Sequence, residues 1–183
     1  MTPQAADIGL TRQNPNAVFS KIEDYFTHRG TGWSPTHAVL FVSETQVIEA
    51  VSPFVKISDF SKYQGEGMQW MVLRIQSLGD FQRGEAVGYA EGKYLGKIYD
   101  DAKLLLEALD ADFQTTWWAK TFGIDRTPIC SVLVAAAMKV AAFRFKDPKT
   151  GGLVPVQAVV PNGILAHAME WPSDLSVIDG NIS

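Results

Sequence analysis

Residues 35–51 read PTHAVLFV-SETQ-VIEAV, two β-branched apolar runs on either side of a short polar stretch. This pattern is typical of a β-hairpin, whose side chains alternate between the two faces of the sheet. His37 begins the first run, and Glu49 stands at an even separation from it on the second (49 − 37 = 12). The two side chains are therefore expected on one face, either directly opposite or diagonally adjacent. The stretch predicts an antiparallel sheet that carries an imidazole beside a carboxylate.

Cys130 is the single cysteine, and it stands in the run TPICSVLV at residues 127–134. Thr127 is a favoured N-cap and Pro128 suits the first helical position, so a helix is expected to begin near Pro128. Cys130 then lies in the first turn, where the positive end of the helix dipole favours a thiolate. A lone cysteine forms neither an intramolecular disulfide nor a thiolate-rich zinc site. Cys130 is thus either a small buried apolar residue or a nucleophile.

Each of these residues, taken alone, has an ordinary structural explanation. Cys130 suits the apolar run that follows it, His37 suits a strand start near solvent, and Glu49 suits an edge strand. Together they supply a nucleophile, a base and a group that orients the base, which is what a Cys–His pair requires. We therefore predict a Cys130–His37–Glu49 catalytic triad. His37 and Glu49 are expected on neighbouring antiparallel strands that face the cysteine helix.

The order of motifs resembles the circularly permuted papain-fold hydrolases, the YiiX/YaeF-like group related to NlpC-type cell-wall peptidases. Members begin with a Gly-Asp-Ile strand, continue with Ser/Thr-His and Val-Ile-Glu-Ala strands, and later carry a Tyr-Asp pair, a Cys-Ser-Glu-Leu-Val helix and a proline-containing stretch. The matching segments are ADIGL at 6–10, THAV at 36–39, VIEA at 47–50, YD at 99–100, CSVLV at 130–134 and VPNGIL at 160–165. The resemblance spans roughly residues 5 to 170. Histidine before cysteine is the order that permutation produces.

The resemblance implies one α+β domain with a papain-like fold, circularly permuted, in which an antiparallel sheet packs against helices. It implies an amidase, peptidase or thioesterase acting on a small-molecule, peptide or peptidoglycan-like substrate, or on a lipid amide or ester, without metal or organic cofactor. Cys130 would attack the carbonyl as a thiolate, with His37 as base and then acid and Glu49 orienting His37. The backbone N–H of Cys130 would contribute to an oxyanion hole. Acyl transfer to an acceptor other than water is a close variant.

One position departs from the group's pattern. The glutamate that members carry two residues after the cysteine is Val132 here, so any role of that side chain is absent. A second function therefore stays open, in a different class: a non-catalytic binding or structural module that keeps the fold and an inactive site.

Composition indicates one ordinary globular domain over residues 1–183. With 46% hydrophobic and 20% charged residues, the chain can bury a sizeable core. A net charge of −4 argues against nucleic acid as a partner, because phosphate binding needs a basic face. The N-terminus lacks the apolar segment of a signal peptide, and no uncharged apolar run has the length of a membrane span, ~20 residues. We expect a protein that is cytoplasmic as synthesised and not inserted in a membrane. Release, export without a signal and oligomeric state stay open.

Further strands and helices are expected outside the hairpin. Residues 54–57 and 69–75 are rich in β-formers and should extend the sheet. Residues 81–109 favour a helix in which glycines at 84, 88, 92 and 96 form a smooth stripe for close packing against the sheet or another helix. Alternatively, Gly92 or Gly96 ends one helix and a second begins at Tyr99. The polar segment from about residue 172 is expected as a surface tail.

Other chemistry has weaker support. The histidines at 28, 37 and 167 lack the spacing of a zinc-binding helix, and the glycines match neither a dinucleotide-binding nor a phosphate-binding loop. His167 is the only competitor to His37 as the base, but its apolar setting favours His37. The aromatic residues Trp117, Trp118 and Phe122 either cap the core or line a substrate groove.

Overall fold

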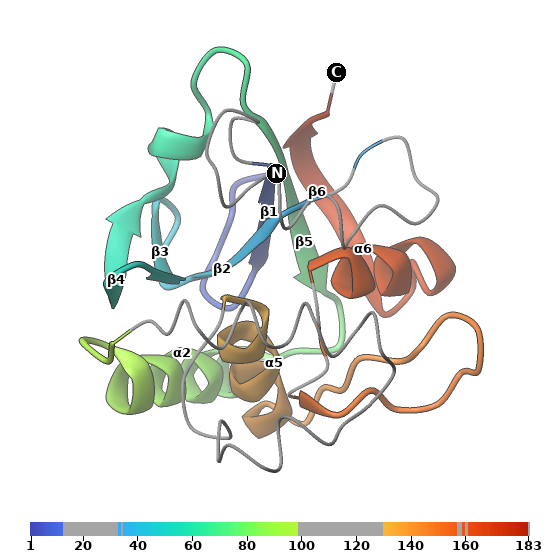
Figure 1. The fold of residues 1–183 in the computed structure, drawn as a ribbon. Helices are drawn as coiled ribbons and strands as arrows, with labels where there is room; N and C mark the ends of the chain where they lie inside the picture. The colour runs from blue at the N-terminus through green and yellow to red at the C-terminus, as the bar shows by residue number, and fades with distance from the viewer. Residues whose placement is uncertain (13–32, 34, 99–129, 157–158, 160, 183) are drawn as a thin grey trace, which may run out of the picture.

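The computed structural model describes all residues except 13–32, 34, 99–129, 157–158, 160 and 183. The described residues form an α+β fold in which a six-stranded antiparallel sheet packs against three α-helices (Figure 1). The strands are β1 (Ile8–Arg12), β2 (His37–Phe41), β3 (Gln46–Val51), β4 (Phe54–Asp59), β5 (Gln69–Ile75) and β6 (Leu175–Asn181). The helices are α2 (Asp80–Tyr94), α5 (Cys130–Val140) and α6 (Pro161–Glu170), with a 3₁₀ turn, η1 (Phe60–Tyr63). The strand order is β4-β3-β2-β1-β5-β6.

The predicted hairpin is confirmed as β2 and β3. Leu40 pairs with Ile48 and Phe41 pairs with Val47 in antiparallel register. The turn is closed by the Val42 N–H, which donates to the Gln46 carbonyl at 2.9 Å. The strands expected at 54–57 and 69–75 are likewise present, as β4 and β5.

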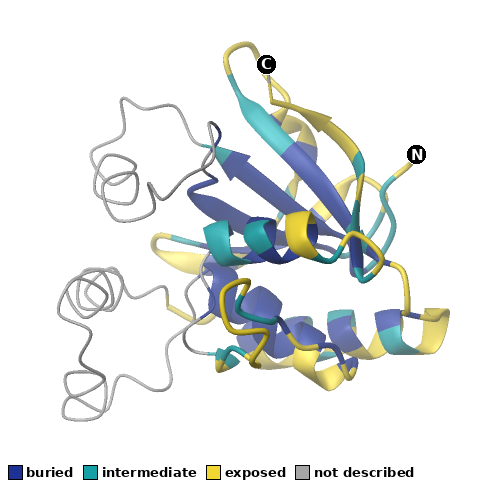
Figure 2. Cartoon of the chain, turned by 90° about the vertical axis from the view of Figure 1, so that its right-hand side faces the viewer, coloured by how far each residue is buried: buried dark blue, intermediate teal, exposed yellow. Residues whose placement is uncertain are grey.

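The sheet has two apolar faces of unequal size. One face carries the main core, where residues such as Leu10, Leu40 and Ile48 pack with Leu133 of α5. Figure 1 shows α2 and α5 lying along this side of the sheet, and Figure 2 shows α5 buried along most of its length. The opposite face carries a smaller cluster, in which Val39 packs with residues of η1 and their neighbours. Because side chains alternate between the two faces along each strand, the same strands supply side chains to both clusters.

Gly9 on β1 is required by the smaller cluster. A Cβ at this position would lie 2.6 Å from Val39 Cγ2 and 3.0 Å from Phe60 Cε2, closer than real Cβ atoms approach. The missing side chain lets the Phe60 ring settle over the strand, 4.7 Å from the Phe41 ring centroid. Gly9 therefore permits η1, which carries two residues of the candidate site, to pack closely on the sheet.

The prediction of close packing along the glycine stripe is wrong. A Cβ added at Gly84, Gly88 or Gly92 would meet no atom within 4 Å, and all three glycines are exposed. Helix α2 instead buries alanines, Ala86 and Ala90, against the core. The stripe lies on the solvent side because the helix rotates to bury its apolar side chains, and a glycine has none to bury.

The end of α2 agrees with the alternative in which Gly96 stops the helix. Gly96 has a φ of 75°, in the left-handed region that favours glycine. Its N–H donates to the Val55 carbonyl at 2.9 Å, and the Val55 N–H donates to the Lys97 carbonyl at 2.8 Å. Pairing with β4 therefore replaces continuation of the helix. Residues 99–109 lie outside the described part of the chain.

The segment after residue 172 is a strand rather than a tail. Leu175–Asn181 forms β6, which pairs antiparallel with β5 at one edge of the sheet. Leu175 is fully buried, whereas most of the strand is exposed or half-buried, in agreement with a surface position. A largely polar sequence can form this strand because an edge strand pairs with one neighbouring strand only, and here a single residue, Leu175, is buried.

Candidate active site

Among the described residues α5 begins at Cys130, close to the helix start expected near Pro128, and the Cys130 side chain is buried. The helix dipole therefore places its positive end at the thiol. The neighbouring Ser131 is also buried, and its hydroxyl donates to the Val159 carbonyl at 2.6 Å. This bond ties the first turn of α5 to the segment preceding α6, so the nucleophile candidate stands on an anchored helix end. Residues 127–129, with the expected cap, lie outside the described residues.

His37 is the first residue of β2 and is almost fully buried. Its Nε2–H donates to Oε2 of Glu49 at 3.3 Å. The Cys130 side chain is one of the groups that raise the pKa of His37. Two of the three predicted residues, His37 and Glu49, are thus joined by a hydrogen bond, and the third, Cys130, acts on the pKa of His37.

The electrostatics favour a charged pair at His37. Burial by itself lowers the pKa of His37, but hydrogen bonding and charge from Cys130, and then from Glu49, outweigh it and raise the pKa from 6.5 to about 10. For Glu49, burial raises the pKa, but the His37 ring, Lys62 and Ser58 together hold it well below its usual range. An imidazolium beside an ionised carboxylate is therefore the stable arrangement at neutral pH.

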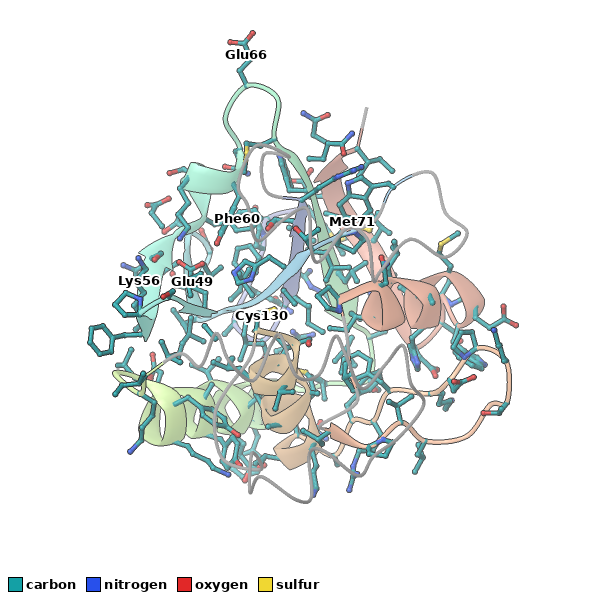
Figure 3. All side chains as sticks on the ribbon, viewed as in Figure 1. Glu49, Lys56, Phe60, Glu66, Met71 and Cys130 are labelled. Carbon is teal, nitrogen blue, oxygen red and sulfur yellow. The ribbon has the colours of Figure 1, made fainter. Side chains whose placement is uncertain are left out.

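The expectation that His37 and Glu49 face the cysteine helix is wrong. Alternation places both residues on the face that carries Val39, whereas Cys130 belongs to the main core on the opposite face. Cys130 still acts on the pKa of His37, which is the first residue of its strand. Figure 3 labels Cys130 at the end of α5 beneath the sheet and Glu49 on β3.

Two residues of η1 contact Glu49 and were not expected from the sequence. Lys62 Nζ donates to Oε1 and Tyr63 Oη donates to Oε2. Ser58 of β4 also helps to lower the pKa of the carboxylate. Of these residues, only Ser58 could have been found from the sequence pattern. It is two residues from Lys56, the cross-strand partner of Glu49, and therefore lies on the same face of the sheet. Lys62 and Tyr63 follow the end of β4, where no strand periodicity applies.

His167, the competing base, has a structural environment of its own. It is fully buried on α6 among aromatic rings, with its centroid 5.5 Å from that of Phe143 and 5.0 Å from that of Trp171. Its Nδ1 accepts from the Lys146 backbone N–H at 2.9 Å. Burial lowers the pKa of His167. A neutral imidazole that accepts from backbone is a packing residue, which supports the preference for His37.

Several sequence predictions fall on residues outside the described ranges. These are His28, the Tyr99–Asp100 pair and the aromatic residues Trp117, Trp118 and Phe122. Val132, the departure from the family pattern, is described: its side chain is buried in α5.

Comparison with known proteins gives one structural relative. The fold matches the crystal structure of the metalloprotein yiiX from Escherichia coli O157:H7 (DUF1105) with a TM-score of 0.55, covering 100% of this chain and 90% of that chain at 21% sequence identity. The chain has the fold of yiiX. No family model matches the sequence, and no curated protein is significantly similar to it. The likeness to yiiX agrees with the resemblance to the YiiX/YaeF-like group at the level of fold.

The described residues do not form a metal site of the usual kind. Within the ranges that the structure describes, no group of three or more His, Cys, Asp or Glu side chains could hold a metal ion. In the same part of the chain, no helix combines the length and apolar character needed to cross a membrane.

Proposed function

We propose that this protein is a cysteine hydrolase of circularly permuted, papain-like type. The single observation that carries the proposal is the position of the His37 ring, which interacts with Cys130 at a helix start and donates from Nε2 to Glu49 at 3.3 Å. A structural cysteine needs neither a buried imidazole nor a buried carboxylate behind it. The substrate would be an amide or ester with a small-molecule, peptide or peptidoglycan-like acyl group, or a lipid amide or ester.

The proposed reaction uses only this chain's own groups. The Cys130 thiolate attacks the carbonyl carbon, forming a C–S bond, and the backbone N–H of Cys130 stabilises the developing oxyanion. The His37 imidazolium gives its proton to the leaving amine or alcohol as the C–N or C–O bond breaks. The neutral imidazole then takes a proton from water, which attacks the thioester, so that the C–S bond breaks to give the carboxylic acid and the Cys130 thiolate beside the restored imidazolium. Glu49 holds the ring in position throughout.

We derive no metal step for this chain. The relative yiiX is described as a metalloprotein, but the described residues offer no set of three ligands.

The proposal is tested by trapping the acyl-enzyme with p-nitrophenyl acetate. We expect a burst of one equivalent of nitrophenolate and a single acetyl group on Cys130, identified by peptide mass spectrometry. The His37→Gln variant should lose the burst, because it lacks the group that generates the thiolate. Equal acetylation of Cys130 in the wild type and in His37→Gln would contradict the proposal.

A second function, a catalytically silent binding or structural module, is favoured by one observation. Val132 replaces the glutamate of the related hydrolases and is buried, so the helix presents no carboxylate at that position. The burst experiment separates the two functions, because a silent module keeps the fold but forms no acyl-enzyme.

A further inference from the structure

Three donors from two segments, β2 and η1, meet at Glu49. His37 donates from β2 to Oε2 at 3.3 Å, and Tyr63 donates its hydroxyl to the same oxygen. Lys62 donates to the other oxygen, Oε1. Both oxygens of the carboxylate are thus held, and the orientation of Glu49 towards His37 depends on η1 as much as on its own strand.

The two η1 residues also contact each other and the imidazole. Lys62 Nζ lies 4.7 Å from the centroid of the Tyr63 ring, and that ring lies 5.8 Å from the His37 ring. Glu49 is fully buried, whereas the Lys62 side chain is 38% exposed. The Lys62 side chain therefore extends from solvent to the buried carboxylate of Glu49, while the Tyr63 ring lies beside the imidazole of His37.

The backbone of η1 is itself fixed. Asp59 caps the turn by accepting from the Ser61 N–H at 2.8 Å, and Phe60 packs into the smaller core cluster over Gly9. Lys62 and Tyr63 consequently occupy defined positions rather than trailing from a loose connection. An isolated buried carboxylate would be costly, so such donors decide whether it stays ionised.

We propose that Lys62 and Tyr63 are positioning residues for the Cys130–His37 pair, acting through Glu49: Lys62 keeps the carboxylate ionised, and Tyr63 fixes its orientation. This inference rests on the proposed function and adds to it. The contribution of Lys62 is mainly its charge, whereas that of Tyr63 is a directed hydrogen bond. The two roles therefore predict different experimental signatures.

The sign of the Lys62 effect follows from the charges around the pair. Among the residues that the structure describes, the charged and titratable groups around Glu49 and His37 are Lys56 of β4, Lys62 and Tyr63 of η1, and Cys130 of α5. Removing the positive charge of Lys62 disfavours the form of the Cys130–His37 pair in which Cys130 is a thiolate. Alkylation of Cys130 should then require a higher pH.

Lys56 provides a matched control. It stands directly across from Glu49 in the β3–β4 register, and Figure 3 labels both residues on neighbouring strands. Lys56 is exposed, and solvent screens its charge. Lys56→Met and Lys62→Met each remove one lysine charge near Glu49, but only the second removes a direct partner of the carboxylate.

The test measures the rate of Cys130 alkylation by iodoacetamide against pH. We expect Lys62→Met and Lys62→Gln to move the acid limb upward by about half a pH unit or more, whereas Lys62→Arg and Lys56→Met keep the wild-type profile. Circular dichroism verifies that each variant is folded. If Lys62→Met does not fold, the result for Lys62→Gln, which retains a hydrogen-bond donor, decides the test. Identical profiles for the Lys62→Gln and Lys56→Met variants would overturn the role of Lys62.

The Tyr63 role is measured with the p-nitrophenyl ester. Tyr63→Phe should lower kcat by about tenfold while KM stays within about twofold, because orientation and not binding is disturbed. A kcat equal to that of the wild type would overturn this role. A wild type whose alkylation shows no acid-shifted limb and which forms no acyl-enzyme would instead refute the proposed function itself, so the two failures are distinguishable.

Discussion

His37 and Glu49 meet diagonally across neighbouring strands, with Nε2 of His37 3.3 Å from Oε2 of Glu49. Continuing the register of Leu40 with Ile48 places Val39, not His37, opposite Glu49. The long imidazole spans the two-residue offset, as diagonal neighbours in antiparallel pairs can. The offset also leaves His37 at the start of β2.

The raised pKa of His37 predicts a pH-dependent stability. A group whose folded pKa lies above its unfolded value stabilises the fold fully below the unfolded value, here 6.5, and that stabilisation is lost as pH rises towards about 10. The free energy of unfolding, from urea titrations at pH 6.5 and pH 9.5, should fall by more than about 1 kcal/mol across this window. His37→Gln should flatten the dependence. An equal slope in that variant would show that other groups cause it.

Cys130→Ser separates chemistry from stability. Serine has nearly the volume of cysteine, and His37 offers its hydroxyl a partner, so the thermal melt should change little while ester turnover is lost. If Cys130 only fills the core, the buried hydroxyl should cost about 1–3 kcal/mol without a selective loss of activity. Melts of both proteins beside an amidase and esterase substrate panel decide between these outcomes.

The buried carboxylate of Asp7 should be essential for folding. Asp7 is fully buried, and its Oδ2 accepts from Arg74 Nη2 at 2.6 Å while Oδ1 accepts from Arg83 Nη1 at 3.3 Å. Asp7→Asn leaves two arginines without their anion and should cost about 3–5 kcal/mol, measured by urea unfolding. Asp179→Asn, on the exposed edge strand, is the control and should change stability by less than about 0.5 kcal/mol. Equal losses of stability in Asp7→Asn and Asp179→Asn would mean that the two arginines do not depend on Asp7.

Ala142 ends α5 in a conformation better suited to glycine. Its φ is 62°, and the bonds from Phe143 N–H to the Met138 carbonyl and from Ala142 N–H to the Lys139 carbonyl form a Schellman motif. Because Ala142 is exposed, Ala142→Gly relieves the strain without loss of packing and should add about 1 kcal/mol. The reverse substitution at Gly96, which has a φ of 75°, should remove about as much. Thermal melts of the two variants should shift in opposite directions.

The candidate site was predictable where it depends on local pattern. The even spacing of His37 and Glu49 within an alternating hairpin places them on one face, and the residues around Cys130 mark a helix start. Both statements depend on near neighbours in the chain, for which strand and helix periodicity is a physical constraint. The same reasoning failed for the glycine stripe of α2, because which side of a helix is buried depends on what packs against it.

The sequence by itself determined the hairpin, the strands at 54–57 and 69–75 and the three residues that a Cys–His–Glu site would use, since their spacing and flanking residues act locally. Only the tertiary structure decided which face of the sheet each group lies on. It also decided that residues 175–181 add a strand and that Lys62 and Tyr63 reach Glu49 from η1. These outcomes depend on contacts between segments distant in sequence, whose free energy comes from burial and pairing across the whole fold. No pattern within a single segment encodes them.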